Sequence, residues 1–240
     1  MKNILKNKIA KIKFQNLNNF KQVVVPLGIP EIDRLLPLNG LQSAKVHEII
    51  GDEIDCSALG FSAALLYLFI NYSKTKNSTV LWCNQGAELY APGIVPFGID
   101  EDQLLLIRSY NNKDVLWAME EGLRSGVLAA VLGEIIDINA TEVRRLHLAS
   151  RVGNIPAFIL RKKSNYFFDY AVATRWKVSA LSTVYNYSEA NKFQNKIYWK
   201  LELMRCQNGM TGNWDVEWAY NENKIYSDKK KRGFNLVSKL

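Results

Sequence analysis

The chain has 240 residues, of which 48% are hydrophobic and 22% are charged; this suffices for one well-buried domain and excludes a disordered protein. Its longest apolar run, residues 58–70, is shorter than the roughly 20 residues of a membrane-spanning helix, and no secretory signal is evident, so no membrane association is expected. The three cysteines, Cys56, Cys83 and Cys206, are widely spaced and fit a reducing cytoplasm.

The net charge of +8 is unevenly distributed along the chain. Residues 1–22 carry six lysines and no acidic residue, and residues 224–240 carry six basic residues against Asp228 alone. A third basic stretch, 143–177, contains eight basic residues and Asp169. Such clustering is typical of proteins that bind nucleic acid or another acidic partner, although basic tails also serve solubility alone. We expect a basic N-terminal helix and linker (1–22), a core domain (23–223) and a basic C-terminal tail (224–240).

The hydrophobic pattern then gives the elements in chain order. Residues 3–14 place apolar side chains at helical spacing among lysines, which predicts a short basic amphipathic helix. Further along, short buried strands are expected at 46–50, 79–83, 104–108, 127–132 and 157–160, and helices at 57–72, 113–124 and 141–152. Continuous apolar strands separated by helices predict an α/β fold, a mostly parallel sheet with helices on both faces.

After residue 172 the pattern changes to alternation with a period of two residues. It covers three segments, 174–181, 196–205 and 214–220, and glycines lie between the last two. This predicts an antiparallel extension of the sheet that ends in a hairpin.

The first junction between a strand and a helix is where a parallel α/β sheet binds its ligand. A phosphate-binding loop at this place needs glycines, a lysine for the phosphates and a hydroxyl for magnesium. Only Gly51 is present, because Ser57 occupies the lysine position and Ala58 the hydroxyl position. Three acidic residues in the loop would repel a nucleotide triphosphate: Asp52, Glu53 and Asp55. The sequence therefore predicts a degenerate nucleotide-binding loop and no cofactor.

Other catalytic positions agree with this interpretation. Asn84, Gln85 and Gly86 follow the second strand, where a nucleotide hydrolase needs an acid. Glu134 ends the fourth strand, where a magnesium-binding aspartate is expected, and without the lysine and hydroxyl a structural role is favoured. His47-Glu48 is not part of a zinc motif and the cysteines are too far apart to form one, so neither a metal site nor an enzyme is expected.

Several segments together resemble a known family. The opening of the core, Gly28 to Asp33, Gly40 to Gln42 and Val46 to Gly51, is similar to the RecA-type core. Four further segments resemble the ImuA family, the bacterial inducible-mutagenesis proteins that are shortened relatives of RecA: Leu89 to Gly93, Leu116 to Gly126, Phe158 to Arg161 and Thr174 to Val178. The resemblance extends from residue 1 to about residue 220.

The resemblance implies an accessory role in damage-induced, error-prone DNA repair. The implied partners are an ImuB-like polymerase-family protein and an error-prone DNA polymerase, with RecA and single-stranded DNA as further candidates. RecA relatives bind ATP, but Ser57, Ala58 and Gly86 depart from that pattern, so ATP hydrolysis is not carried over.

Analogy with RecA also implies two binding elements. The N-terminal helix would pack on a partner through Leu5, Ile9, Ile12 and Phe14. A DNA-facing loop after residue 160 would use basic groups beside aromatic rings, which suit single strands: Arg161, Lys162, Lys163, Tyr166, Phe167, Phe168 and Arg175. Two alternatives remain open for this loop. Its phenylalanines would fill the core while its lysines are solvated, or its aromatic residues would contact protein.

Two rival functions follow from the same fold. One is an ATP-dependent recombinase of the RecA type with an unusual nucleotide loop, which predicts measurable nucleotide affinity. The other is a SulA-like cell-division inhibitor, which predicts binding to the division protein FtsZ and no need for the basic residues of 161–177.

Overall fold

The computed structural model describes residues 23–51, 56–72, 78–85, 89–162, 172–181, 197–221 and 231–237. The larger helices are α3 (Ser57–Tyr72), α4 (Asn112–Arg124) and α5 (Ala140–Gly153), and α2 (Pro30–Asp33) is a single short turn. Three further 3-10 turns lie between Ala91 and Gln103, and a fourth covers Pro37–Asn39. The strands are β1 (Val24–Val25), β2 (Leu41–Gln42), β3 (Val46–Gly51), β4 (Val80–Gln85), β5 (Leu104–Ser109), β6 (Ala130–Glu134), β7 (Ala157–Lys162), β8 (Thr174–Ala180), β9 (Ile197–Cys206), β10 (Gly212–Asn221) and β11 (Lys231–Leu236).

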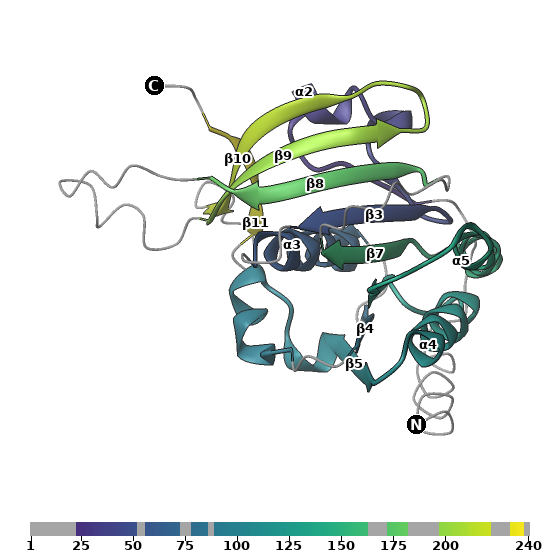
Figure 1. Cartoon of the computed structure of the whole chain (residues 1–240). Helices are drawn as coiled ribbons and strands as arrows, with labels where there is room; N and C mark the ends of the chain where they lie inside the picture. Colours follow the sequence, from purple (N-terminus) through teal and green to yellow (C-terminus); the bar gives the residue numbers. More distant parts are fainter. Residues whose placement is uncertain are drawn as a thin grey trace.

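Nine of these strands form one sheet in the order β11-β10-β9-β8-β3-β7-β6-β4-β5. Neighbouring strands from β8 to β5 are parallel, and β8–β9, β9–β10 and β10–β11 are antiparallel (Figure 1). The α/β fold with a mostly parallel sheet is confirmed. The antiparallel part begins one strand later than expected, because β8 lies parallel to β3 and only β9 reverses direction.

Helices cover both faces of the parallel region. Along β7, Phe158 and Leu160 point into the core formed with α3, whereas Ala157 and Ile159 point into the core formed with α4 and α5. Because successive residues of a strand face opposite sides, a strand buried on both faces must be apolar throughout. This explains why β3, β4, β6 and β7 lack alternation in the sequence. In Figure 1, α4 and α5 lie side by side at the right of the sheet.

Helix α3 is the most deeply buried element, with 12 of its 16 residues in the interior. On its outer side the aromatic rings of the antiparallel strands gather around Phe61, whose centroid is 5.9 Å from Trp199 and 5.6 Å from Phe234. A helix that is apolar on every side is typical of such an enclosed position. No helix in the part of the chain described above is long and apolar enough to cross a membrane.

Two differences from the expected bounds change the extent of the sheet. Strand β6 begins at Ala130 instead of residue 127, because 127–129 connect α4 to the sheet and Ala129 N–H donates to the Thr79 carbonyl at 2.9 Å. Strand β11 lies within the segment assigned to a basic C-terminal tail, and it buries Phe234 against Trp218 at a centroid distance of 4.7 Å. The sheet therefore extends beyond residue 223.

The glycine-to-aspartate segment at the start of the core has a structural role. The Asp33 carboxylate accepts hydrogen bonds from the backbone N–H groups of Leu27, at 2.7 Å, and Gly28, at 3.0 Å. Gly28 has a φ of +91°, in a region that favours glycine. The two residues therefore fix the turn that leads into α2.

His47 is buried in the middle of this architecture, with 1% of its surface exposed. Its Nδ1 lies 2.9 Å from Thr174 Oγ1, and its Nε2 lies 3.0 Å from the carbonyl oxygen of Gln42. Because that carbonyl can only accept, Nε2 carries the proton and Nδ1 accepts from the hydroxyl. Burial lowers the pKa of His47 to about 4, so the ring is neutral in the folded protein at physiological pH.

We expect the free energy of unfolding to fall as the pH is lowered from 7.5 to 5. The unfolded chain binds a proton at His47 near pH 6.5, whereas the folded chain does so only near pH 4. Over this interval the group removes about 2 kcal/mol of stability. Urea unfolding at both pH values measures the loss, and His47→Gln serves as the comparison because it removes the titrating ring. Equal pH dependence of the two proteins would contradict the assignment.

Candidate functional site

The candidate site is the edge of the sheet where the parallel strands end and α3 begins. A Cβ built on Gly51, the last residue of β3, would lie 2.4 Å from the Cβ of Ala58 in the first turn of α3. Only glycine fits at such a distance, so the strand end and the helix are in direct contact. The acidic residues of the intervening loop, Asp52, Glu53 and Asp55, lie outside the described residues.

The positions that a phosphate-binding loop would use are inside the protein. Ser57 is 9% exposed and Ala58 is 4% exposed. The Ala58 carbonyl accepts a hydrogen bond from the Ser62 hydroxyl at 2.6 Å, within the same helix. These side chains supply neither a cation nor an open hydroxyl to a phosphate group. The first turn of α3 is built for packing against β3.

Glu134 lies at the end of β6, on the same side of the sheet as α3. Its Oε1 accepts a hydrogen bond from the indole Nε1–H of Trp82 at 2.7 Å, and Trp82 is fully buried. A buried indole N–H needs such a partner, so this carboxylate oxygen satisfies the tryptophan. The arrangement supports the structural role that the sequence favours for Glu134. On β4, Asn84 is 1% exposed where a hydrolase would present an acid to water.

Metal and thiol chemistry find little support in the described residues. Among them, no three His, Cys, Asp or Glu side chains converge to hold a metal ion. Burial raises the pKa of the Cys83 thiol strongly, so it remains protonated. Cys206 is also buried, and Cys56 is exposed.

Two of the predicted DNA-binding residues lie beside Glu48, Arg161 in the interior and Arg175 with 13% of its side chain exposed. Arg161 is 2% exposed; its Nη1 lies 4.0 Å from Glu48 Oε1, and its Nη2 donates to the Ile136 carbonyl at 3.0 Å. Arg175 forms a second ion pair with Glu48 through Nε. The buried Arg161 is therefore not available at a DNA-facing surface, and the guanidinium group of the partly buried Arg175 is paired with Glu48.

The strand register explains this cluster. Glu48 on β3 lies opposite Arg175 on β8. On the other side of β3, Arg161 on β7 lies opposite Ile50, which is two residues beyond Glu48. All three side chains point to the same face of adjacent strands, so one carboxylate lies between two guanidinium groups. The sequence signal for this cluster is the charged Glu48 within the otherwise apolar strand β3. The partners of Glu48 depend on the order of the strands in the sheet, which the sequence does not give.

The remaining candidates lie outside the description. Lys162 ends β7 and only its backbone is described, while Lys163, Tyr166, Phe167 and Phe168 lie outside the described residues. The same is true of the N-terminal candidates Leu5, Ile9, Ile12 and Phe14.

We expect Glu48→Gln to lower the free energy of unfolding by about 3–5 kcal/mol, because it leaves two arginine charges in the interior without their carboxylate. Glu202→Gln is the matched control, since Glu202 pairs with Lys177 at 3.9 Å where both side chains are about 40% exposed. Its loss should not exceed about 1 kcal/mol. Denaturant unfolding of both variants measures the difference, and similar losses would contradict the role of the cluster.

Comparison with known proteins shows a similarity over most of the chain. No protein-family model matches the chain. The protein named "Protein ImuA" from two strains of Caulobacter vibrioides is 25% identical over 204 residues, which covers 81% of this chain and 83% of the relative. The match covers most of both chains, as expected from the resemblance of the separate segments. The chain is therefore similar to ImuA over about four-fifths of its length.

Proposed function

We propose that the protein is a non-catalytic accessory factor of damage-induced mutagenesis that acts in the cytoplasm by binding partner proteins. The observation that carries the proposal is the similarity to ImuA over four-fifths of both chains. The proposed process, damage-induced mutagenesis, is inferred from this similarity, and the proposed mode of action is inferred from the candidate site.

The lack of catalysis is inferred from packing at the end of the sheet. At the start of α3 a phosphate group would meet the buried side chains of Ser57 and Ala58, which supply no ammonium group, and Ala58 stands where a magnesium-binding hydroxyl is needed. One oxygen of Glu134, the carboxylate at the expected magnesium position, accepts a hydrogen bond from Trp82. These features support the accessory role over an ATP-dependent recombinase.

The proposed partners are an ImuB-like polymerase-family protein and an error-prone DNA polymerase, with RecA as a further candidate. The basic amphipathic segment 3–14 is the proposed contact, because its apolar side chains recur on one helical face. Single-stranded DNA remains a candidate ligand only through residues 162–170, since Arg161 and Arg175 are committed to Glu48.

The proposal is tested in source cells from which the gene has been deleted. Wild-type protein should restore mutations induced by ultraviolet light and should copurify with polymerase-type proteins. The variant Leu5→Asp/Ile9→Asp/Ile12→Asp should lose both activities, because it replaces the apolar face of the segment. The matched control Lys6→Gln/Lys8→Gln/Lys13→Gln keeps that face and should retain both.

Two results would contradict the proposal. Unchanged induced mutation after deletion of the gene would remove the protein from this process. Copurification of FtsZ in place of polymerase-type proteins would indicate the SulA-like function in cell division.

A further inference from the structure

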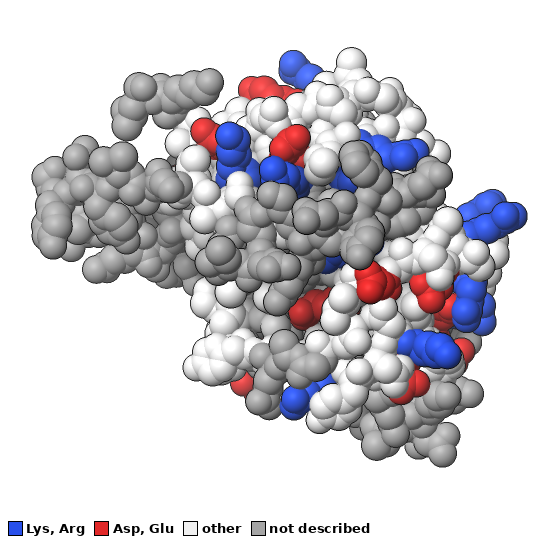
Figure 2. Space-filling model, in the orientation of Figure 1, with Lys and Arg blue, Asp and Glu red and all other residues white. Residues whose placement is uncertain are grey.

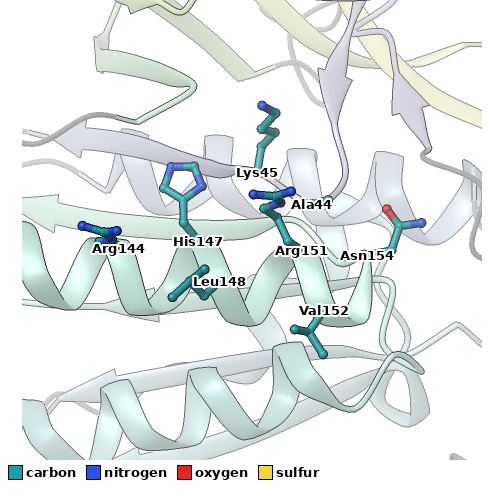
Figure 3. Close-up of a pocket in the computed structure, with 8 residues that line it drawn as sticks. All are labelled: Ala44, Lys45, Arg144, His147, Leu148, Arg151, Val152 and Asn154. Carbon is teal, nitrogen blue, oxygen red and sulfur yellow. The ribbon is translucent and has the colours of Figure 1, made fainter.

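An open groove lies at the opposite end of the sheet from the candidate site, where the parallel strands begin. It has a volume of about 840 Å³ and runs between α5 and the turn that precedes β3. Figure 3 shows Arg144, His147 and Arg151 on the side of α5 that faces Lys45. Leu148 and Val152 lie on the adjoining side of the same helix. We call this depression the α5 groove.

Hydrogen bonds fix the two walls of the groove to each other. The Ser43 hydroxyl donates to Asn154 Oδ1 at 2.9 Å, which joins the turn to the residue that caps α5. The carbonyl of Lys45 accepts from the Ser150 hydroxyl at 3.3 Å and from the Ala157 N–H at 2.9 Å. A partner would therefore meet a preformed surface, which lowers the entropic cost of binding.

The cationic groups of the groove lack acidic partners in the described structure. Among the described residues, no carboxylate forms an ion pair with Lys45, Arg144 or Arg151. The Lys45 ammonium donates to the neutral amide of Gln207 at 3.2 Å. Arg145 differs, because it pairs with Glu120 at 2.8 Å. Figure 2 shows Lys and Arg side chains on the side of the molecule where Figure 1 places α5.

The groove also carries apolar surface. Leu148 is 54% exposed and Val152 is 66% exposed, and they lie one turn apart on α5. Arg144 and Arg151 lie seven residues apart, or about 10 Å along the helix axis. The helix thus presents a row of positive groups beside a row of apolar groups, the arrangement that an amphipathic segment recognises through positions three, four and seven residues apart.

We propose that the α5 groove binds an acidic amphipathic segment of a partner protein. Carboxylates spaced by two helical turns pair with Arg144 and Arg151, and an apolar side chain packs on Leu148 and Val152. Arginine binds carboxylates through two parallel hydrogen bonds and is enriched at protein interfaces. A nucleic-acid backbone would use the cations but would leave the apolar pair exposed to water, so the observations favour a protein.

This proposal rests on the proposed accessory function only in assuming that the protein binds another protein. The α5 groove lies on the core and is separate from segment 1–22. The test uses the purified full chain, so a failure of the role in mutagenesis would leave its outcome unaffected.

The test selects short random peptides displayed on phage against the wild-type chain and measures their affinity by fluorescence anisotropy. Enriched peptides should combine acidic and apolar residues, and their affinity should fall at high salt.

The double variant Arg144→Glu/Arg151→Glu should weaken peptide binding more than about tenfold. Leu148→Ser/Val152→Ser should also weaken it. The control Lys113→Glu/Lys200→Glu changes the net charge equally outside the groove and should bind as wild type. All variants replace exposed side chains, and their melting temperatures are compared with that of the wild type.

Three results would overturn the proposal. The first is enrichment of peptides without acidic residues, and the second is equal affinity for wild type and for Arg144→Glu/Arg151→Glu. The third is binding of a single-stranded or duplex oligonucleotide that depends on the two arginines but not on Leu148 and Val152, which would assign the groove to nucleic acid.

Discussion

The structure depends most on the burial of α3 between the parallel strands and the aromatic residues of the antiparallel extension. Twelve of its residues are inside, and its first turn touches the end of β3 through Gly51 and Ala58. Removing apolar surface on this scale from water is the main favourable contribution to folding. The antiparallel strands contribute Trp199, Trp218 and Phe234 to the same core, so they complete the domain and are not an appendage.

The same packing constrains function. In a nucleotide-binding relative, the start of the equivalent helix has to leave its backbone open to phosphate and to present a lysine and a hydroxyl. Here these positions are occupied by Ser57 and Ala58, both buried. A similar constraint applies to the neighbouring strands β4 and β6. There a carboxylate oxygen of Glu134 accepts the hydrogen bond that the buried indole N–H of Trp82 needs. The proposed loss of catalysis and the stability of the core thus follow from one set of contacts.

Function is then expected at surfaces away from this edge. The α5 groove is held in shape by hydrogen bonds between Ser43 and Asn154 and between Ser150 and Lys45. Its cations and apolar groups remain exposed, in contrast to Arg161 and Arg175, whose charges are enclosed with Glu48. In the proposed function, the α/β core serves in this way as a rigid platform for partner proteins.

Local sequence patterns predicted much of the fold. The bounds of α3 are as predicted because its apolar run is continuous, and the pattern predicts β3, β4, β6 and β7 because these strands are apolar on both faces. The expectations that the structure changed depend on contacts between residues that are distant in sequence. Arg161 and Arg175 belong to an obviously basic stretch, and only the order β8-β3-β7 brings them to Glu48. Similarly, the lysines around residue 230 favoured a solvated tail over a strand, whereas the segment forms β11, and its Phe234 is part of the core. The interpretation of Ser57 and Ala58 as poor phosphate ligands stays a prediction, and the sequence could not reveal that both residues are buried.

We propose that this end of the sheet does not bind a nucleotide, and isothermal titration of the purified full chain with magnesium-ATP measures this. We expect no saturable binding with a dissociation constant tighter than about 1 mM, which corresponds to a standard binding free energy of about −4 kcal/mol. Saturable binding tighter than this, lost on Glu134→Ala, would contradict the claim and would favour the recombinase.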